Sequence, residues 1–570
     1  MVRSDHWFRV AIMLLDYNPK KHLFFVKVAR NDPQVSVLMK SHGLDMSLPD
    51  TTPMEAVLMT SEPYAAASFA AHATERARAQ LAPILSQVEL SRAENSDVSI
   101  RIPMDKELWP FQRASVAYAL SRRHCLIGDQ PGLGKTPIAI AFANEVRAKR
   151  VLVICPASIR LQWVARIREW TTMPWPYHIY PILSGNRGVH PTAEWTVVSY
   201  DLARTEAIGR ALAQGRYDVL ILDEAHYLKT IDAERTQSIF GDHTGVFRKA
   251  IKEDKKIVGW KELFPALASR CERVLCLTGT PLPNRPREAY TIARSLCFDS
   301  IDWMSEERFK ERFNPSARLE GVRKDGSTYM YTREEVGRAG ELQNRMRANF
   351  MARHLKRDVM PQLKLPVYDL IQAEETGPVK QALKAESLLQ IDPEQLAGAN
   401  AEVLGNWAEV RHMMGRAIAP QVCSYVGTCL DGGDEKILLG GWHKDVLDIY
   451  CSKLAAYGVL RIDGSTSSNG KTDRVNQFRT DPTKRVMVGN VISLGTGTDG
   501  LQDVCDHIVI GEPDPVPGNN EQFVDRLDRG GQTRTVLADL FVAPNSLLER
   551  ILARALHKRQ NTHQALDEVF

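Results

Sequence analysis

The chain has almost no excess of one charge. Its 570 residues include 73 Lys and Arg against 69 Asp and Glu, which gives a formal net charge of +4. A histone-like or tail-driven nucleic-acid binder would be far more basic, so the total excludes that class. A net charge of +4 still allows a basic stripe on one face of the protein, because such a stripe adds little to the net charge.

The nine cysteines show no spacing pattern. No two of them are separated as Cys-x-x-Cys, so the sequence carries no zinc signature. Their number is odd and the chain is long, which argues against a disulfide framework. This cysteine usage indicates a reducing, cytosol-like compartment.

Long apolar runs are also missing. No run approaches the ~20 residues of a membrane-spanning helix, so we expect no membrane partner. The apolar residues 8–15 are followed by Asp16 and a turn, not by small residues, which indicates a strand and not a signal peptide. A composition of 44% hydrophobic and 25% charged residues is ordinary for a soluble globular protein.

Residues 1–100 form a distinct opening region. The apolar runs 8–15 and 23–28 flank the turn-forming residues 18–21, which predicts a hairpin. The Ala-rich stretch 64–90 predicts one long helix. We interpret this region as a small α+β accessory domain and as a candidate contact for a protein partner.

Beyond residue 105, short apolar runs alternate with helical stretches. The runs lack polar alternation, which is typical of strands covered on both faces of a parallel sheet. They lie in two groups, at 151–154, 195–199, 219–222 and 274–277, and at 436–439, 459–462, 486–488 and 507–510. The sequence therefore predicts an α/β fold with two parallel-sheet domains.

The segment between these two groups is more polar and more helical. We divide the chain into an accessory domain (1–100), a first α/β domain (101–298), a helical insertion and linker region (299–430) and a second α/β domain (431–570). Residues 241–261 are a polar insertion in the first α/β domain. Residues 320–332 predict an exposed hairpin or loop.

A glycine-rich turn lies between the apolar strand 125–127 and the helix-prone stretch 138–148. The turn consists of Gly132, Leu133, Gly134, Lys135 and Thr136. In this context backbone N–H groups surround phosphates, the lysine reaches the β- and γ-phosphates, and the threonine hydroxyl binds Mg²⁺. The sequence thus predicts an ATP and Mg²⁺ site. A plain glycine-rich turn before a helix is the alternative, and the motifs that follow argue against it.

Two carboxylates stand at the end of a buried strand. Asp223 and Glu224 directly follow the run 219–222. At that position Asp223 would hold the Mg²⁺, and Glu224 would orient or deprotonate the attacking water. His226 is a candidate relay to the other domain, or else an ordinary histidine at the start of a helix.

Two arginines near the C-terminus can complete such a site. Hydrolysis develops charge on the γ-phosphate, which an arginine from outside the P-loop stabilises. Arg526 and Arg529 are three residues apart, so on a helix they share a face, and they reach the phosphates only if the second domain closes on the first. Alone, such a pair would also fit a solvated helix. The predicted catalytic residues are Lys135, Asp223, Glu224, Arg526 and Arg529.

The strict P-loop pattern has a glycine where this chain has Asp129. Motif-like segments occur in order at 108–112, 129–136, 155–163, 199–201, 223–226, 277–281, 441–444, 495–497 and 522–532. This order resembles the Snf-type ATPases of helicase superfamily two. It is most similar to the annealing-helicase branch and its bacterial and phage relatives. The resemblance runs from about Leu108 to Leu552 and implies two RecA-like domains.

The resemblance also implies roles for further residues. Gln112 would read the adenine, and Asp129 belongs to the nucleotide-binding motif. The implied contacts to the DNA backbone are Ser158, Gln162, Trp163 and Thr496. The residues implied to couple the ATP state to the grip on DNA are His226, Thr278, Gly279, Thr280 and Gln532.

Three positions depart from the family pattern. His354 stands where the family usually has the second of two arginines, Pro515 stands where it tends to have tryptophan, and Asp499 is an extra acidic residue. The first two concern domain linkage and DNA contact. None of the three removes a residue needed for hydrolysis.

These observations predict a DNA-dependent ATPase that translocates along double-stranded DNA, forked or branched duplexes included. It would remodel or reanneal DNA or displace bound proteins. Two alternatives stay open: a motor subunit of a defence or restriction complex, and a strand-separating helicase. We expect a cytoplasmic protein of a bacterial or phage-infected cell, or a nuclear protein in a eukaryote.

Overall fold

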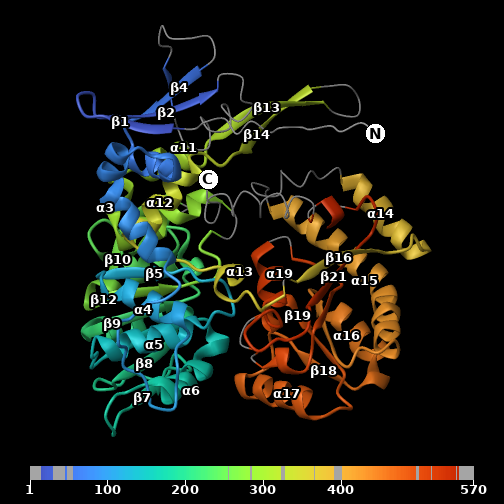
Figure 1. The fold of residues 1–570 in the computed structure, drawn as a ribbon. Coiled ribbons are helices and arrows are strands. Elements are labelled where there is room, and N and C mark those ends of the chain that lie inside the picture. The colour runs from blue at the N-terminus through green and yellow to red at the C-terminus, as the bar shows by residue number, and fades with distance from the viewer. Residues whose placement is uncertain are drawn as a thin grey trace.

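Two α/β lobes lie beside each other, and a small N-terminal sheet lies at one end of the first lobe (Figure 1). The computed structural model describes residues 14–29, 45–47, 55–253, 256–282, 285–322, 328–364, 366–389, 401–495, 498, 500–514, 517–546, 548–550 and 552. The predicted α/β class with two parallel sheets is confirmed.

The first lobe contains a seven-stranded parallel sheet in the order β15-β5-β12-β9-β6-β8-β7. Its strands are β5 (His124–Ile127), β6 (Val151–Cys155), β7 (Ile179–Pro181), β8 (Trp195–Ser199), β9 (Tyr217–Asp223), β12 (Cys271–Leu277) and β15 (Met351–Ala352). Its helices include α4 (Pro110–Leu120), α5 (Lys135–Glu145), α6 (Arg160–Trp170), α7 (Tyr200–Ala203), α8 (Glu206–Gln214), α9 (Glu234–Phe240) and α10 (Ala289–Leu296).

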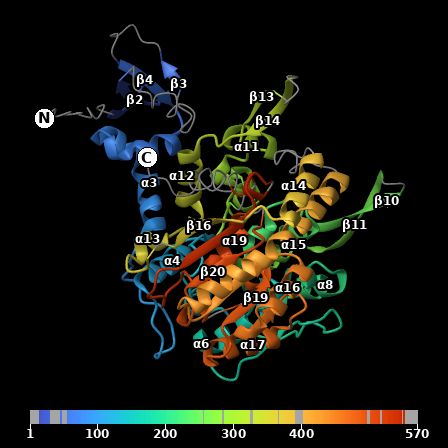
Figure 2. The same cartoon turned by 90° about the vertical axis from the view of Figure 1, so that its right-hand side faces the viewer.

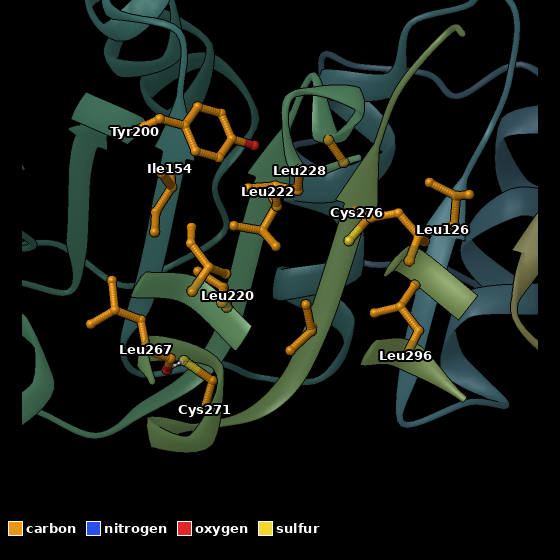
Figure 3. Close-up of a cluster of buried hydrophobic side chains, with 14 of the residues drawn as sticks. Leu126, Ile154, Tyr200, Leu220, Leu222, Leu228, Leu267, Cys271, Cys276 and Leu296 are labelled. Carbon is orange, nitrogen blue, oxygen red and sulfur yellow. Dashed lines mark hydrogen bonds between the residues drawn. The ribbon is translucent and has the colours of Figure 1, made fainter. Parts of the chain in front are cut away.

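Both faces of this sheet are covered. Along β6, Leu152 and Ile154 join one apolar cluster, while Val151 and Val153 join a second one. Figure 3 shows part of the first cluster, with Ile154 among the side chains from neighbouring strands. Successive side chains of a strand point to opposite faces, so a strand with two covered faces needs a continuous apolar run. This explains the runs seen in the sequence.

The second lobe contains a six-stranded parallel sheet in the order β16-β21-β20-β17-β19-β18. Its strands are β16 (Val367–Gln372), β17 (Ile437–Gly441), β18 (Val459–Ile462), β19 (Val486–Asn490), β20 (His507–Ile510) and β21 (Leu537–Val542). Its helices include α14 (Gly377–Leu389), α15 (Ala401–Asp431), α16 (Lys444–Lys453), α17 (Ser468–Thr480), α18 (Val491–Leu494) and α19 (Pro517–Val524).

The range 299–430, expected to be a helical insertion and linker, contributes a strand to each sheet. β15 is only two residues long, and β16 lies at a sheet edge with mostly exposed residues, so neither forms an apolar run. The same range contains α11 (Glu306–Phe313), β13 (Ser316–Val322), β14 (Thr328–Glu334), α12 (Ala339–Asn349) and α13 (Lys356–Val359).

Two hairpins project from the first lobe (Figure 2). The pairing of β13 with β14 confirms the hairpin expected at residues 320–332. The polar insertion at 241–261 belongs to a second hairpin, formed by β10 (Val246–Glu253) and β11 (Lys256–Pro265).

The N-terminal sheet is antiparallel, in the order β1-β2-β4-β3. Its strands are β1 (Leu14–Asn18), β2 (Leu23–Ala29), β3 (Asp45–Ser47) and β4 (Glu55–Thr60). The pairing of β1 with β2 confirms the expected hairpin, although residues 8–13 lie outside the described part.

The single helix expected over 64–90 is wrong, because the segment forms α2 (Pro63–Ala66), a 3₁₀ turn and α3 (Glu75–Arg92). Thr74 begins α3 anew, since its hydroxyl oxygen accepts from the backbone N–H of Ala77 at 3.2 Å. The same hydroxyl donates to Asp16 of β1 at 2.7 Å, which ties the start of the helix to the sheet.

The N-terminal helices dock on α12 of the first lobe through polar contacts. The Arg345 side chain is 1% exposed and forms ion pairs with Glu341, Glu62 and Asp302 at 2.6–2.7 Å. Glu62 precedes α2 and Glu341 lies in α12, so this network joins the two regions. No helix in the described ranges is both long and apolar enough to cross a membrane.

Replacing Arg345 with methionine should strongly destabilise the protein. The change removes the buried one of the two arginines that pair with both Glu62 and Glu341 and leaves them only the more exposed Arg312. Breaking a buried ion pair from one side costs about 3–5 kcal/mol, and Arg312 should keep the loss near the lower end. The free energy of the first urea-unfolding transition measures this loss. Arg308→Met, at an exposed position of α11, is the control. A loss no larger than that of the control would contradict the structural role of the network.

Candidate active site

The glycine-rich turn connects β5 to α5. Gly132 has a φ of +84° and Gly134 a φ of +75°, a left-handed conformation that glycine adopts without a steric penalty. Helix α5 begins at Lys135, so Lys135 and Thr136 occupy its first turn. Backbone N–H groups at such a helix start point outward and favour an anion, as expected of a phosphate-binding loop.

Gln112 of α4 supports this loop directly. Its Nε2 donates to the carbonyl oxygen of Leu133 at 3.0 Å, and its Oε1 accepts from the backbone N–H of Trp109 at 2.9 Å. Both ends of the amide therefore have partners within the chain. Recognition of adenine by Gln112 remains a prediction.

Asp129 supports the loop from inside the protein. Its carboxylate is fully buried and accepts from the Ser115 hydroxyl at 3.0 Å and from the His354 backbone N–H at 2.9 Å. Nδ1 of His354 lies 2.8 Å from the same carboxylate. Asp129 was expected among the nucleotide-binding residues, but its side chain is bound to protein groups, so we assign it the support of the loop.

The Asp129–His354 pair is electrostatically matched. Although burial acts against both charges, Asp129 raises the pKa of His354, and His354 lowers the pKa of Asp129. His354 occupies the position where the family pattern has its second arginine. The histidine thus puts one cation in the place of another. Unlike an arginine, this cation is a titratable imidazole whose pKa is raised.

Lys135 is half-buried among carboxylates and carbonyl oxygens. Its Nζ donates to the carbonyl oxygens of Asp129 at 2.8 Å and Gln130 at 3.3 Å. Burial lowers the pKa of Lys135, and the charges of Glu224, Asp129 and Asp223 oppose that shift. The lysine therefore lies close to both carboxylates at the end of β9.

Asp223 and Glu224 stand at the carboxyl end of β9. Asp223 Oδ2 accepts from the indole N–H of Trp163 at 2.8 Å, and burial followed by the Glu224 charge raises the pKa of Asp223. Glu224 has a φ of +52°, a strained conformation of the kind that concentrates at functional sites. Although burial opposes it, His226, Lys135 and Arg526 lower the pKa of Glu224.

Four of the five predicted coupling residues lie together. Nδ1 of His226 lies 3.1 Å from the Thr278 hydroxyl, 3.5 Å from the Thr280 hydroxyl and 3.3 Å from Glu224. A Cβ added to Gly279 would lie 2.5 Å from Pro131, so this segment packs on the phosphate loop. Gln532 lies elsewhere, because its Nε2 donates to the Cys505 carbonyl oxygen of the second lobe at 2.9 Å.

The second lobe contacts the phosphate loop through residues 525–529. A Cβ added to Gly132 would lie 2.8 Å from the Cβ of Arg529 and 3.3 Å from the carbonyl oxygen of Asp528. The expectation that a helix carries Arg526 and Arg529 is wrong, because α19 ends at Val524 and both arginines lie in the following turns. Backbone N–H groups of residues 526–528 still donate to the carbonyl oxygens of Phe523 and Val524, so the segment stays coiled after the helix ends.

The predicted DNA-contacting residues have different surroundings. Ser158 and Gln162 are half-buried and follow the carboxyl end of β6. Trp163 is 2% exposed and bonds to Asp223, which corrects the expectation that its side chain contacts DNA. A large apolar ring on an inward-facing position of α6 packs in the core. Thr496 lies outside the described residues.

Sequence reasoning missed two basic residues beside His354. Nη1 of Arg353 donates to the carbonyl oxygens of Gly128 at 2.5 Å and Gly279 at 3.4 Å. Nζ of Lys356 forms ion pairs with Asp525 and Asp528 of the second lobe. Their partners are distant in the sequence, so no local pattern marks them, and the only signal was the family's paired arginines.

The SNF2-related domain family matches residues 111–241, which include the phosphate loop, the two carboxylates and His226. This part of the chain is therefore similar to the Snf-type ATPases of helicase superfamily two. This confirms the resemblance inferred from the motif order.

Curated relatives of the chain include the "DNA annealing helicase and endonuclease ZRANB3" of Mus musculus, which is 27% identical over 81% of this chain and 41% of the relative. The "SWI/SNF-related matrix-associated actin-dependent regulator of chromatin subfamily A-like protein 1" of Xenopus laevis is 28% identical over 81% of this chain and 45% of the relative. The chain thus spans less than half the length of these relatives.

Among solved structures, the "Sulfolobus solfataricus SWI2/SNF2 ATPase core in complex with dsDNA" is 16% identical. The alignment covers 81% of this chain and 97% of that chain, with a TM-score of 0.34.

Replacing Gly132 with alanine should weaken nucleotide binding. A residue with a Cβ is strained at this φ and collides with Arg529, and a forced left-handed residue costs about 1–3 kcal/mol, or about 10-fold in affinity. Titration with a fluorescent ATP analogue measures the affinity. Gly188→Ala, which meets no atom within 4 Å, is the control. Equal affinity of the two variants would contradict the close packing of the loop.

The Asp129–His354 pair should make stability depend on pH. The raised His354 pKa contributes stability that is full below the ordinary His value of 6.5 and is lost as pH rises through the raised value. The lowered Asp129 pKa contributes stability that is full above the ordinary Asp value of 3.8 and is lost as pH falls through the lowered value.

His354→Gln should therefore lower the melting temperature more at about pH 6 than at about pH 10. His178→Gln is the matched control, because the His178 side chain is 67% exposed. A His354 effect that is constant across this range would show that the pair does not titrate as described.

Proposed function

We propose that the chain hydrolyses ATP between its two lobes and uses the energy to translocate along double-stranded DNA. One observation carries this proposal: the segment with Arg526 and Arg529 packs directly on Gly132 of the phosphate loop. Groups from both lobes thus converge on one site. An interdomain site links the chemistry of the nucleotide to the opening and closing of the lobes.

In this proposal the chain's own residues share the work of hydrolysis. Lys135 binds the β- and γ-phosphates, and Glu224, held by His226, orients and deprotonates the attacking water. Arg526 and Arg529 stabilise the charge that develops on the γ-phosphate. His226, Thr278 and Thr280 connect this chemistry to the segment after β12, so that a change at Glu224 reaches that segment.

Thr136 and Asp223 would hold Mg²⁺. Hydroxyl and carboxylate oxygens are donors that Mg²⁺ prefers; Thr136 lies in the first turn of α5, and Asp223 ends β9. A bound Mg²⁺ would neutralise phosphate charge. The indole N–H of Trp163 fixes one oxygen of Asp223 and so orients the carboxylate.

The proposed DNA contact is to the phosphate backbone, through Ser158, Gln162 and Thr496, without base readout. One relative is a DNA annealing helicase and endonuclease, which supports remodelling or reannealing of forked or branched duplexes as the task. Residues 1–100 remain the candidate contact for a protein partner. The proposed compartment is the bacterial cytoplasm, or the nucleus in a eukaryote.

Duplex DNA should stimulate ATP hydrolysis several-fold, and Lys135→Ala should abolish the stimulated rate because the β- and γ-phosphates lose their cation. Steady-state phosphate release, measured with duplex, forked, single-stranded and RNA ligands, tests this. Lys149→Ala, at an exposed position after α5, should hydrolyse like the wild type. Failure of every nucleic acid to stimulate hydrolysis would rule out the motor.

A triplex-displacement assay beside a strand-unwinding assay then distinguishes translocation from strand separation. Displacement without unwinding supports the proposal. Unwinding of a forked duplex would assign the chain to the strand-separating helicases instead.

A further inference from the structure

Lys356 contacts both lobes at the site between them. It begins α13, which lies between the two lobes in Figure 1. Its backbone N–H donates to Oε1 of Gln130 in the phosphate loop at 2.7 Å. Its side chain, 7% exposed, forms ion pairs with Asp525 and with Asp528 Oδ2, the latter at 2.7 Å. One residue thus joins the phosphate loop to the segment of the second lobe that packs on it.

The two aspartates that Lys356 holds stand next to the two proposed catalytic arginines. Asp525 precedes Arg526, and Asp528 precedes Arg529. Lys356 also donates to the backbone carbonyl oxygen of Asp528, and Nε of Arg529 donates to the carbonyl oxygen of Asp525 at 2.9 Å. Fixing the aspartates therefore fixes the backbone from which both arginine side chains extend.

Asp525 also needs a cation for an electrostatic reason. Its charge acts on Lys135: burial lowers the pKa of Lys135, and Asp525 is one of the carboxylates that oppose this. An unpaired carboxylate so close to the phosphate-binding lysine would compete for that lysine and repel the phosphates. The ion pair with Lys356 neutralises this charge.

We propose that Lys356 is a positioning residue: it latches residues 525–529 onto the phosphate loop and neutralises Asp525 beside it. This inference rests on the proposed ATP hydrolysis. The ammonium group of Lys356 is held by Asp525 and Asp528. It acts through Arg526 and Arg529, whose stabilisation of charge is needed in the transition state more than in the bound ground state.

Three variants test the latch. Lys356→Met removes the charge and keeps the length of the side chain, Lys356→Arg keeps the charge, and Arg357→Met is the matched control because its side chain is 62% exposed. The readouts are kcat and KM for ATP with duplex DNA, the affinity for a fluorescent ATP analogue, the melting temperature, and the radius of gyration of the nucleotide-bound protein in small-angle scattering.

Lys356→Met should lower kcat by about 10-fold or more, because misplaced arginines lose transition-state contacts, while nucleotide affinity changes by less than about 3-fold. Lys356→Arg should recover most of the rate, and the control should match the wild type. The radius of gyration of Lys356→Met should increase, because the lobes separate when their ionic contact is lost.

An unchanged kcat in Lys356→Met overturns the inference. So does an equal loss of rate, affinity and melting temperature that arginine fails to restore, because that pattern indicates a general folding role. Should the wild type itself hydrolyse no ATP, the proposed function fails, and the scattering comparison alone decides whether Lys356 holds the lobes together.

Discussion

A short ladder of backbone hydrogen bonds holds the phosphate loop in place. The N–H groups of Leu126, Gly128 and Gln130 donate to the carbonyl oxygens of Phe350, Ala352 and His354 at 2.7, 2.7 and 3.1 Å. Residues 350–354 thus extend the sheet by one strand and run alongside the loop as it leaves β5. Side chains of this segment add to the support, because Arg353 bonds to Gly128 and His354 to Asp129. Lys356, two residues further on, pairs with the second lobe.

Charge balance is the second constraint on the site. Asp129 is buried, and Lys135, Asp223 and Glu224 are half-buried, so that desolvation acts against the charge of each. Each has a partner of opposite charge or a hydrogen-bond donor at short range, as Trp163 is for Asp223. These partners keep the groups charged in a partly desolvated site, where their interactions with phosphates are stronger than in water.

The parts of the site that sequence patterns predicted are those encoded locally. The phosphate loop, the carboxylates after β9 and the strands around them depend on neighbours within a few residues, so spacing was sufficient. Local spacing could not predict contacts between distant segments. β15 is too short to form a pattern, and the partners of Arg353 and Lys356 lie far away in the sequence. The prediction that Arg526 lies on a helix was wrong, because α19 ends at Val524, two residues before it. The segment that follows packs on Gly132, a contact between distant parts of the chain that a local pattern does not encode.

The N-terminal helix α3 contacts residues 350–354, and this contact affects which residues fold as one unit. The Ser91 hydroxyl donates to the carbonyl oxygen of Met351 at 2.7 Å, and Nε2 of His354 lies 2.9 Å from the carbonyl oxygen of Ala93. A fragment that begins at residue 101 would keep every nucleotide-binding motif and still leave both groups without these partners. The end of α3 therefore shares a cooperative unit with the catalytic lobe, and a boundary drawn by motif would cut through it.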